Sequence, residues 1–218
     1  MPYARALELQ EDLVRKRREG TIQDTLVLVQ HPHVITMGSS TDPANILADE
    51  EERAARGIEL HKAGRGGDVT YHGPGQLVAY PILDLKPDRK DLHRYLRDLE
   101  TVLIGTAAEF GVDAERDEAG TGVWTERGKL AAIGIRVSSG WITSHGIALN
   151  VDTELAYFDT IIPCGITNRA VTSLERELGD APPLEDVADA LLACFCKTFS
   201  RDLDGAQVSS KDQPLVSG

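Results

Sequence analysis

The sequence predicts one α+β domain in which helices flank a mixed or antiparallel sheet. The chain has 218 residues, 41 % of them hydrophobic, which suffices for one sizeable core. Apolar residues recur at helical spacing in several segments, and short runs rich in β-branched residues lie between them. No internal repeat or linker divides the chain. We therefore expect one domain over residues 1–205, followed by a tail, residues 206–218, that frays.

The elements expected in chain order alternate between the two types. Helical periodicity covers residues 3–19 and stops at Gly20. Residues 25–32 form a buried strand, 49–56 a short helix and 58–62 a strand that leads into a glycine-rich loop. A further strand covers 76–85, and a long amphipathic helix 92–110. Residues 122–151 contain two turn signals and predict three antiparallel strands with Lys129 at the start of the middle one. A loop region that leads to a short helix comes next, and a final amphipathic helix covers residues 184–200.

Composition excludes several classes of protein. The net charge of −12 and the pI near 4.9 argue against nucleic-acid binding, which depends on basic side chains that neutralise phosphates. No apolar run approaches the length of a membrane span, and "MPYARALELQEDLVRKRREG" is no signal peptide, so we expect a soluble, cytoplasmic protein. Three cysteines form no disulfide framework. Cys194 and Cys196 diverge by about 200° on a helix and cannot share a metal ion.

One basic run, Arg15 to Arg18, interrupts the acidic composition. The simpler interpretation is the solvated end of a helix, where cations also suit the helix dipole. The alternative is a docking site for an acidic partner.

Cys164 is a candidate nucleophile because it lies between Pro163 and Gly165, in a setting that favours a tight, accessible loop. A thiol with a pKa near 8.5 needs a neighbouring cation or base to react at neutral pH. Lys129, His72 and His145 are candidates. Each also has a structural interpretation: Lys129 as a solvated strand end and His145 as a hydrogen-bonded core histidine. For any one of these residues taken alone, the structural interpretation is the better one.

The segment "RGGDVTYHGPGQLVAYP", residues 65–81, is rich in glycine but leads into a strand. Phosphate-binding glycine loops open a helix instead, which makes a dinucleotide site a weak hypothesis. The glycines allow close approach of the backbone, and Tyr71 with the apolar strand can line a groove. An elongated apolar ligand with one reactive end fits such a groove.

This segment closely resembles the signature of the lipoyl(octanoyl) transferases. Three further stretches resemble the same family in the same order: "HPHVITMG", "GKLAAIGIRV" with "SHGIALN", and "IIPCGITN". The resemblance covers residues 26–178. His33 departs from the pattern, which more often has a second proline there.

The resemblance implies the catalytic-domain fold of biotin and lipoate protein ligases, and transfer of an octanoyl group from acyl carrier protein to a lysine. The acceptors would be lipoyl domains of 2-oxoacid dehydrogenases and the glycine cleavage H protein. It implies that Cys164 is the acyl-accepting nucleophile, that Lys129 lowers its pKa, and that no metal or cofactor takes part; we expect a monomer. Lys129 or His72 would take the proton of the incoming amine. The implied substrate-binding residues are Arg65, Gly66, Gly67, Asp68, Val69, Thr70, Tyr71, His72, Ala132, Ile133, Gly134, Gly146, Ile147 and Ala148.

Two rival functions remain at this point. A ligase of the same fold would adenylate lipoate or biotin with ATP, but it would not need Cys164. A non-catalytic protein that binds an acyl group or an acyl carrier would need the groove without Cys164 or Lys129. A cysteine hydrolase is a weaker hypothesis, because water would then resolve the thioester.

Overall fold

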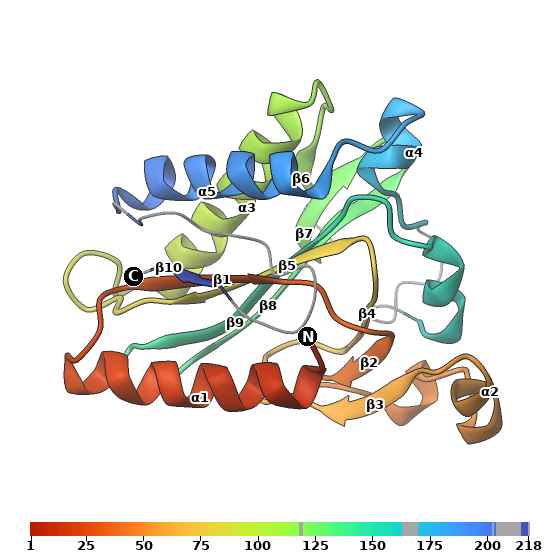
Figure 1. Ribbon diagram of the computed structural model, residues 1–218, viewed down its shortest axis with the longest axis horizontal. Coiled ribbons are helices and arrows are strands. Elements are labelled where there is room, and N and C mark those ends of the chain that lie inside the picture. Colours follow the sequence, from red (N-terminus) through yellow and green to blue (C-terminus); the bar gives the residue numbers. More distant parts are fainter. Residues whose placement is uncertain (118–119, 163–169, 202, 204–214, 218) are drawn as a thin grey trace.

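The computed structural model describes residues 1–117, 120–162, 170–201, 203 and 215–217. The predicted α+β class is confirmed, but the strands form two sheets instead of one (Figure 1). The main sheet is antiparallel throughout and has the order β10 (Leu215–Ser217), β1 (Thr25–Val29), β5 (Gln76–Ile82), β9 (Thr143–Asn150), β8 (Gly128–Val137), β7 (Gly120–Thr125) and β6 (Glu115–Asp117). In the small sheet, β2 (Val34–Met37) pairs in parallel with β3 (Glu59–Lys62) and antiparallel with β4 (Val69–His72).

Helices cover both faces of the main sheet (Figure 1). On one face lie α3 (Leu92–Glu109) and α5 (Leu184–Phe199), and on the other lies α1 (Tyr3–Glu19), with the small sheet beside it. The short helices are α2 (Glu50–Ala55) and α4 (Leu174–Leu178), with 3-10 turns η1 (Pro43–Asn45) and η2 (Leu155–Thr160). All three long helices match the predicted segments to within one residue at each end.

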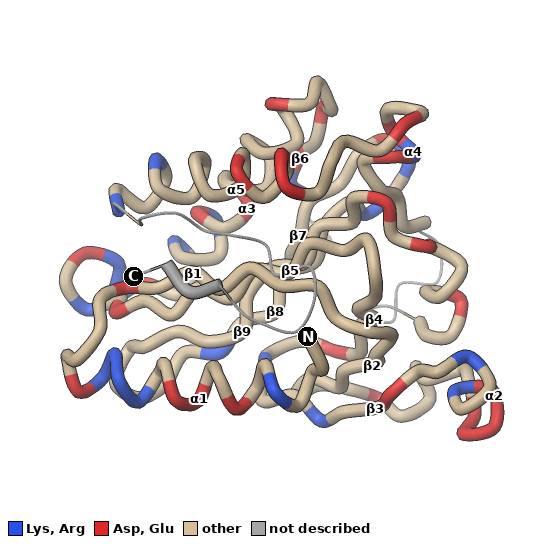
Figure 2. The backbone as a smooth tube through the Cα atoms, in the orientation of Figure 1, with Lys and Arg blue, Asp and Glu red and all other residues tan. Residues whose placement is uncertain are grey.

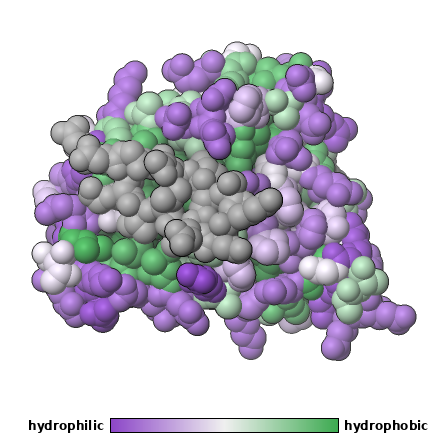
Figure 3. Space-filling view, in the orientation of Figure 1, coloured by the Kyte–Doolittle hydropathy of each residue, from purple (hydrophilic) through white to green (hydrophobic). Residues whose placement is uncertain are grey.

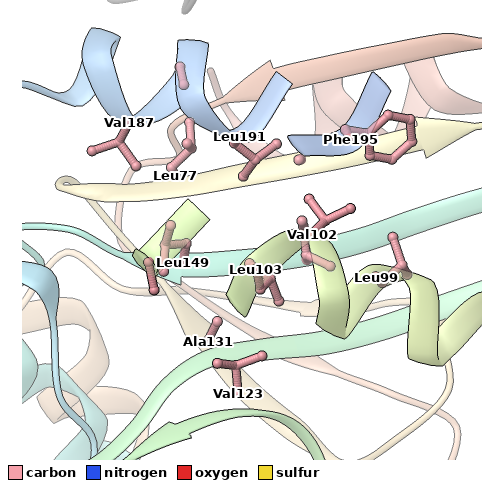
Figure 4. Packing of buried hydrophobic residues seen from close by; sticks show 14 of the residues in the cluster. Leu77, Leu99, Val102, Leu103, Val123, Ala131, Leu149, Val187, Leu191 and Phe195 are labelled. Carbon is pink, nitrogen blue, oxygen red and sulfur yellow. The ribbon is translucent and has the colours of Figure 1, made fainter. Parts of the chain in front are cut away.

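The largest core lies between the main sheet and the pair α3 and α5 (Figure 4). Leu77 and Leu149 point up from β5 and β9, and Leu103, Leu191 and Phe195 meet them from the two helices; all five are at most 1 % exposed. A second core joins α1 to the opposite face of the same strands. The main sheet is therefore buried on both sides, and it supplies a rigid platform for side chains at its strand ends.

The glycine-rich segment of residues 65–81 contains a strand, β4, where the sequence predicted a loop. Val69 and Tyr71 of β4 are buried against Ile35 and Phe158, while the glycines before and after them make the turns. The dense glycines concealed the alternation of the four residues of β4. The segment therefore passes from the small sheet into the main sheet at Gly73–Gly75.

The C-terminal end also differs from the expectation. Leu215–Ser217 pair with Leu26–Leu28 of β1, whereas we expected these residues to belong to a frayed tail. Each residue of β1 is buried, and its outer edge offers backbone groups that a returning strand can satisfy. Within the described residues, no helix combines the length and the apolar character needed to cross a membrane.

The basic run on α1 is largely neutralised by the chain itself. Arg15 and Lys16 pair with Asp12, and Arg17 Nε lies 2.7 Å from a carboxylate oxygen of the buried Asp24. Acidic and basic residues mix along α1 (Figure 2), and its outer surface is mostly hydrophilic (Figure 3). This arrangement supports the interpretation of the run as a solvated helix end.

Candidate active site

A cleft that is partly open to solvent lies where the small sheet meets β5, β8 and β9 of the main sheet. All of the predicted substrate-binding residues line it except Gly66 and Tyr71, and Lys129 lines it too. The cleft is also lined by residues that the sequence did not predict as binding residues: Tyr3, Gln76, Val78, Tyr80, Ala131, His145, Asn150, Phe158 and Val171.

Gly66 and Tyr71 do not line the cleft but bond to the segments that form its wall. The Gly66 N–H donates to the carbonyl of Ile135 at 2.8 Å, which joins the segment before β4 to β8. The Tyr71 hydroxyl lies 2.7 Å from His33 Nδ1, and its ring stacks on Tyr157 at 5.3 Å between centroids. His33, the departure from the family pattern, therefore helps to fix Tyr71.

A β-bulge brings Lys129 to the cleft. Val123 pairs with Ala131 and Trp124 with Lys129, so that one step along β7 matches two steps along β8. The extra residue reverses the alternation of side chains along β8. Lys129 thereby reaches the face of β8 that carries Ala132 and Gly134, and it is only 9 % exposed.

Glycines and an aromatic ring shape the space around the Lys129 side chain. A Cβ on Gly122 would stand 2.8 Å from Lys129 Cε, so this position must be glycine for the lysine to keep its course. Lys129 Nζ also lies 5.2 Å from the centroid of the Trp124 ring, a cation–π contact.

The chain on either side of Cys164 is anchored to this site, although Cys164 itself lies outside the described residues. Before it, the Ile162 N–H donates to the carbonyl of Asn45 at 2.8 Å. After it, the chain pairs with Lys129: the Lys129 N–H donates to Ala170 at 2.9 Å, and the Thr172 N–H donates to the Lys129 carbonyl at 3.0 Å.

Arg65 organises the cleft wall through the protein's own oxygens. Its buried guanidinium donates to the carbonyls of Asp68 and Thr36, both at 2.7 Å, and to the Thr36 hydroxyl at 2.8 Å. A Cβ on Gly134 would stand 2.9 Å from Arg65 Cδ, so that glycine lets the arginine cross over β8. These bonds hold the guanidinium in the cleft wall.

Two buried histidines, His72 and His145, line the cleft, and a third, His31, packs against His72 with 5.8 Å between the ring centroids. Burial lowers the pKa of His72 to about 3 and those of His31 and His145 to about 4. All three are therefore neutral at pH 7. His145 has a left-handed backbone, with φ of 56°, and its N–H donates to Gln10 of α1 at 2.7 Å. This bond comes from the backbone and not from the imidazole, which is buried and lines the cleft.

Tyr3 and Tyr80 also line the cleft, next to these histidines. The Tyr3 ring stacks on His72 at 6.2 Å between centroids, and the Tyr80 hydroxyl lies 2.7 Å from His31 Nε2. Tyr3 carried no sequence signal, because α1 comes to the cleft only through tertiary packing. Gln76 and Asn150 stood inside the quoted motifs, and their amide groups on strand ends were the signal available for them.

The site combines an apolar trough with one buried amine, an arrangement suited to acyl chemistry. Val78, Ile133 and Ala148 offer apolar surface, and Lys129 offers a positive charge beside it. Among the residues that the structure describes, no three His, Cys, Asp or Glu side chains gather as a metal site requires.

Comparison with known proteins gives one consistent result. The model of the lipoyl protein ligase A/B catalytic domain matches residues 2–196. Octanoyltransferase from Rubrobacter xylanophilus is 53 % identical over 195 residues, which cover 89 % of this chain and 87 % of that protein. The octanoyltransferase of Acidobacterium capsulatum is 52 % identical over 216 residues (92 % and 87 %), and that of Chloroflexus aggregans 49 % over 199 residues (90 % of each).

Solved structures agree on the fold. A lipoate-protein ligase A bound with ATP superposes with a TM-score of 0.72 at 17 % identity, covering 91 % of this chain and 83 % of that one. A bipartite lipoate protein ligase from Thermoplasma acidophilum gives 0.71 at 18 % identity, with 93 % and 83 % covered. The predicted catalytic-domain fold is confirmed, and so is the resemblance that the four sequence blocks indicated.

Proposed function

The chain belongs to the family of lipoyl protein ligase A/B catalytic domains, and on this premise we propose that its cleft transfers an octanoyl group through a thioester on Cys164. It is an octanoyltransferase of protein lipoylation, the activity for which its relatives are named. The observation that carries the proposed mechanism is Lys129, buried in an apolar cleft and paired through its backbone with the segment that follows Cys164.

The first half of the reaction loads the enzyme. The Lys129 ammonium stabilises the Cys164 thiolate, since a nearby cation favours the charged form of a thiol. The thiolate attacks the carbonyl carbon of the octanoyl thioester on acyl carrier protein. The carbon–sulfur bond to the carrier breaks, the carrier thiol leaves with a proton from Lys129, and a neutral lysine remains beside the acyl-enzyme.

The second half delivers the octanoyl group. The neutral amine of a lysine on a lipoyl domain attacks the acyl-enzyme, and the bond between carbon and Cys164 sulfur breaks. The amine loses one proton to Lys129, which restores the starting ammonium and thiolate pair. A thioester is already activated, so the balance needs no ATP.

Lys129 is better suited than His72 to accept the proton of the incoming amine. With a pKa of about 3, His72 holds a proton too weakly to take one from an amine at neutral pH. Burial is the main cause, and the neighbouring His31 adds to it. His72 is better suited to accept a hydrogen bond than to accept the proton.

Sequence identity separates the transferase from the ATP-dependent ligase. The relatives near 50 % identity are octanoyltransferases. The lipoate ligases share only 17–18 % identity with the chain, and their similarity shows the fold alone. Acceptors on lipoyl domains follow from the activity. The acyl carrier protein as donor is our proposal, because it presents octanoate as the thioester that the mechanism requires.

A single mixing experiment tests this function. The protein is incubated with octanoyl acyl carrier protein and a lipoyl domain without ATP, and intact masses are followed. We expect octanoylation of the domain and a transient octanoyl adduct on the enzyme, neither of which should form with Cys164→Ser. Cys196→Ser, a half-buried cysteine on α5, is the matched control and should transfer normally. A requirement for ATP, or full transfer by Cys164→Ser, would contradict the proposal.

A further inference from the structure

A chain of buried side-chain amides connects His72 to the segment that pairs with Lys129. Asn150 Nδ2 donates to the carbonyl of Thr172 at 3.0 Å, and Asn150 Oδ1 accepts from Gln76 Nε2 at 2.9 Å. Gln76 Oε1 then lies 2.7 Å from His72 Nδ1. Gln76 and Asn150 are 2 % and 4 % exposed, so no bulk water competes for these bonds. We call these two amides the amide relay.

The backbone fixes the direction of every bond in the amide relay. A carbonyl can only accept, so the contact with Thr172 requires the NH₂ group of Asn150 there and leaves its oxygen facing Gln76. Gln76 must then present its own NH₂ group to Asn150, which it also directs to the carbonyl of Tyr71 at 3.3 Å. Its oxygen faces His72 and can only accept. His72 therefore carries its proton on Nδ1, and Nε2 has the lone pair.

The free side of His72 belongs to the cleft. Its ring lines the pocket, and no hydrogen bond to Nε2 occurs among the described residues. The titratable and charged groups around the ring are Tyr3 from α1, His31 after β1, Arg65 before β4, Lys129 on β8 and His145 on β9. Among the cleft-lining residues, Asp68 also carries a carboxylate, whose Oδ2 accepts from Asn45 Nδ2 at 2.6 Å, and burial keeps the His72 imidazole neutral. A neutral Nε2 on a ring that is held by a hydrogen bond at Nδ1 is a fixed hydrogen-bond acceptor.

We propose that Gln76 and Asn150 are positioning residues which present His72 Nε2 as an acceptor for an N–H of the incoming lysine amine. The amide relay holds that acceptor in register with Lys129, because Thr172 bonds both to Asn150 and to the Lys129 backbone. The bond aims the amine lone pair at the acyl-enzyme, and the proton still leaves to Lys129. The inference rests on the proposed function and assigns the relay to the second half of the reaction.

The wild-type protein allows a test that needs no activity. Nitrogen chemical shifts of the His72 ring, followed by NMR with a His72→Gln variant for assignment, report its tautomer. We expect the Nδ1–H form without protonation from pH 8 down to pH 5. The Nε2–H tautomer, or an imidazolium at pH 6, would overturn the proposal whether or not the protein transfers octanoate.

Gln76→Glu tests the relay in the reaction. The carboxylate still accepts from Nδ1 but no longer donates to Asn150 Oδ1 or to the Tyr71 carbonyl, and it favours the imidazolium, whose Nε2 can only donate. Near pH 6.5 we expect transfer from a preformed acyl-enzyme to the lipoyl domain to slow about 10- to 100-fold, the usual effect of disturbing the partner that orients a functional imidazole. Near pH 9 most of this loss should be recovered. Formation of the acyl-enzyme should change by less than about twofold.

Gln30→Glu is the matched control, since Gln30 Oε1 accepts from the Gly75 N–H at 2.8 Å and does not touch His72. It adds the same charge nearby and should leave the pH profile of the second half unchanged. Equal slowing of both halves in Gln76→Glu, or the same pH profile in Gln30→Glu, would overturn the proposal. Absence of octanoyl transfer by the wild type would refute the proposed function instead, and the tautomer would still test the relay.

Discussion

Gly122 is the residue at which one added methyl group should disturb Lys129 most directly. Its φ of 136° is costly for other residues, and an added Cβ would stand 2.6 Å from the Ala131 carbonyl and 2.8 Å from Lys129 Cε. We expect Gly122→Ala to lower the free energy of unfolding by about 1–3 kcal/mol. Because the lysine must move, acyl-enzyme formation measured by intact mass should slow at least about tenfold.

Gly111→Ala separates backbone strain from the effect on Lys129. Gly111 has φ of 77° with nothing within 4 Å of an added Cβ, so only the left-handed conformation costs free energy, about 1–2 kcal/mol. Its acyl-enzyme formation should match the wild type when both proteins are fully folded. Equal rates for Gly122→Ala and the wild type would show that the Lys129 side chain tolerates displacement.

At the scale of elements, α4 fastens the chain that returns from Cys164 to the main sheet. Glu177 Oε1 accepts from the hydroxyls of Thr125 at 2.9 Å and Thr172 at 2.6 Å. It thereby joins α4 to β7 and to the residue that bonds Lys129. We expect Glu177→Ala to cost about 2 kcal/mol of unfolding free energy in urea and to reduce kcat for octanoyl transfer about tenfold.

Glu175→Ala is the control on the same helix, because Glu175 is exposed and its side chain accepts no hydrogen bond within the described residues. It should stay within about 0.5 kcal/mol of the wild type and keep its kcat. If both variants lost kcat equally, α4 would act through its helical stability and not through the clamp on Thr172.

The sequence predicted the regular elements of this fold better than the irregular ones. Periodicity located α1, α3 and α5, because each buries one regular stripe. It missed β4, where glycines break the pattern, and it could not show the bulge that turns Lys129 into the cleft. Motifs found most of the cleft lining, Arg65 included, but they could not show that the Arg65 guanidinium bonds the oxygens of Thr36 and Asp68. Contacts between distant strands decide such roles, and one sequence does not contain them.

For the whole molecule, the buried histidines predict loss of stability in mild acid. His31, His72 and His145 have folded pKa values of about 4, 3 and 4, each depressed chiefly by burial, against about 6.5 in an unfolded chain. Below pH 6.5 these three histidines bind protons in the unfolded state but remain neutral in the folded state. The stability that these groups contribute is therefore complete above pH 6.5 and is lost as the pH falls toward 4.

The loss should be steep enough to measure by urea unfolding between pH 8 and pH 4.5. Each histidine removes about 1.4 kcal/mol per pH unit, so the three together approach about 4 kcal/mol per unit. That slope would exhaust a typical domain stability of about 5–15 kcal/mol within a few pH units. His31→Gln can still bond the Met1 carbonyl and the Tyr80 hydroxyl, and it should flatten the slope by about one proton. His93→Gln, an exposed control on α3, should not change it. A slope in His31→Gln equal to that of the wild type would contradict the contribution of the buried His31 ring to the acid limit.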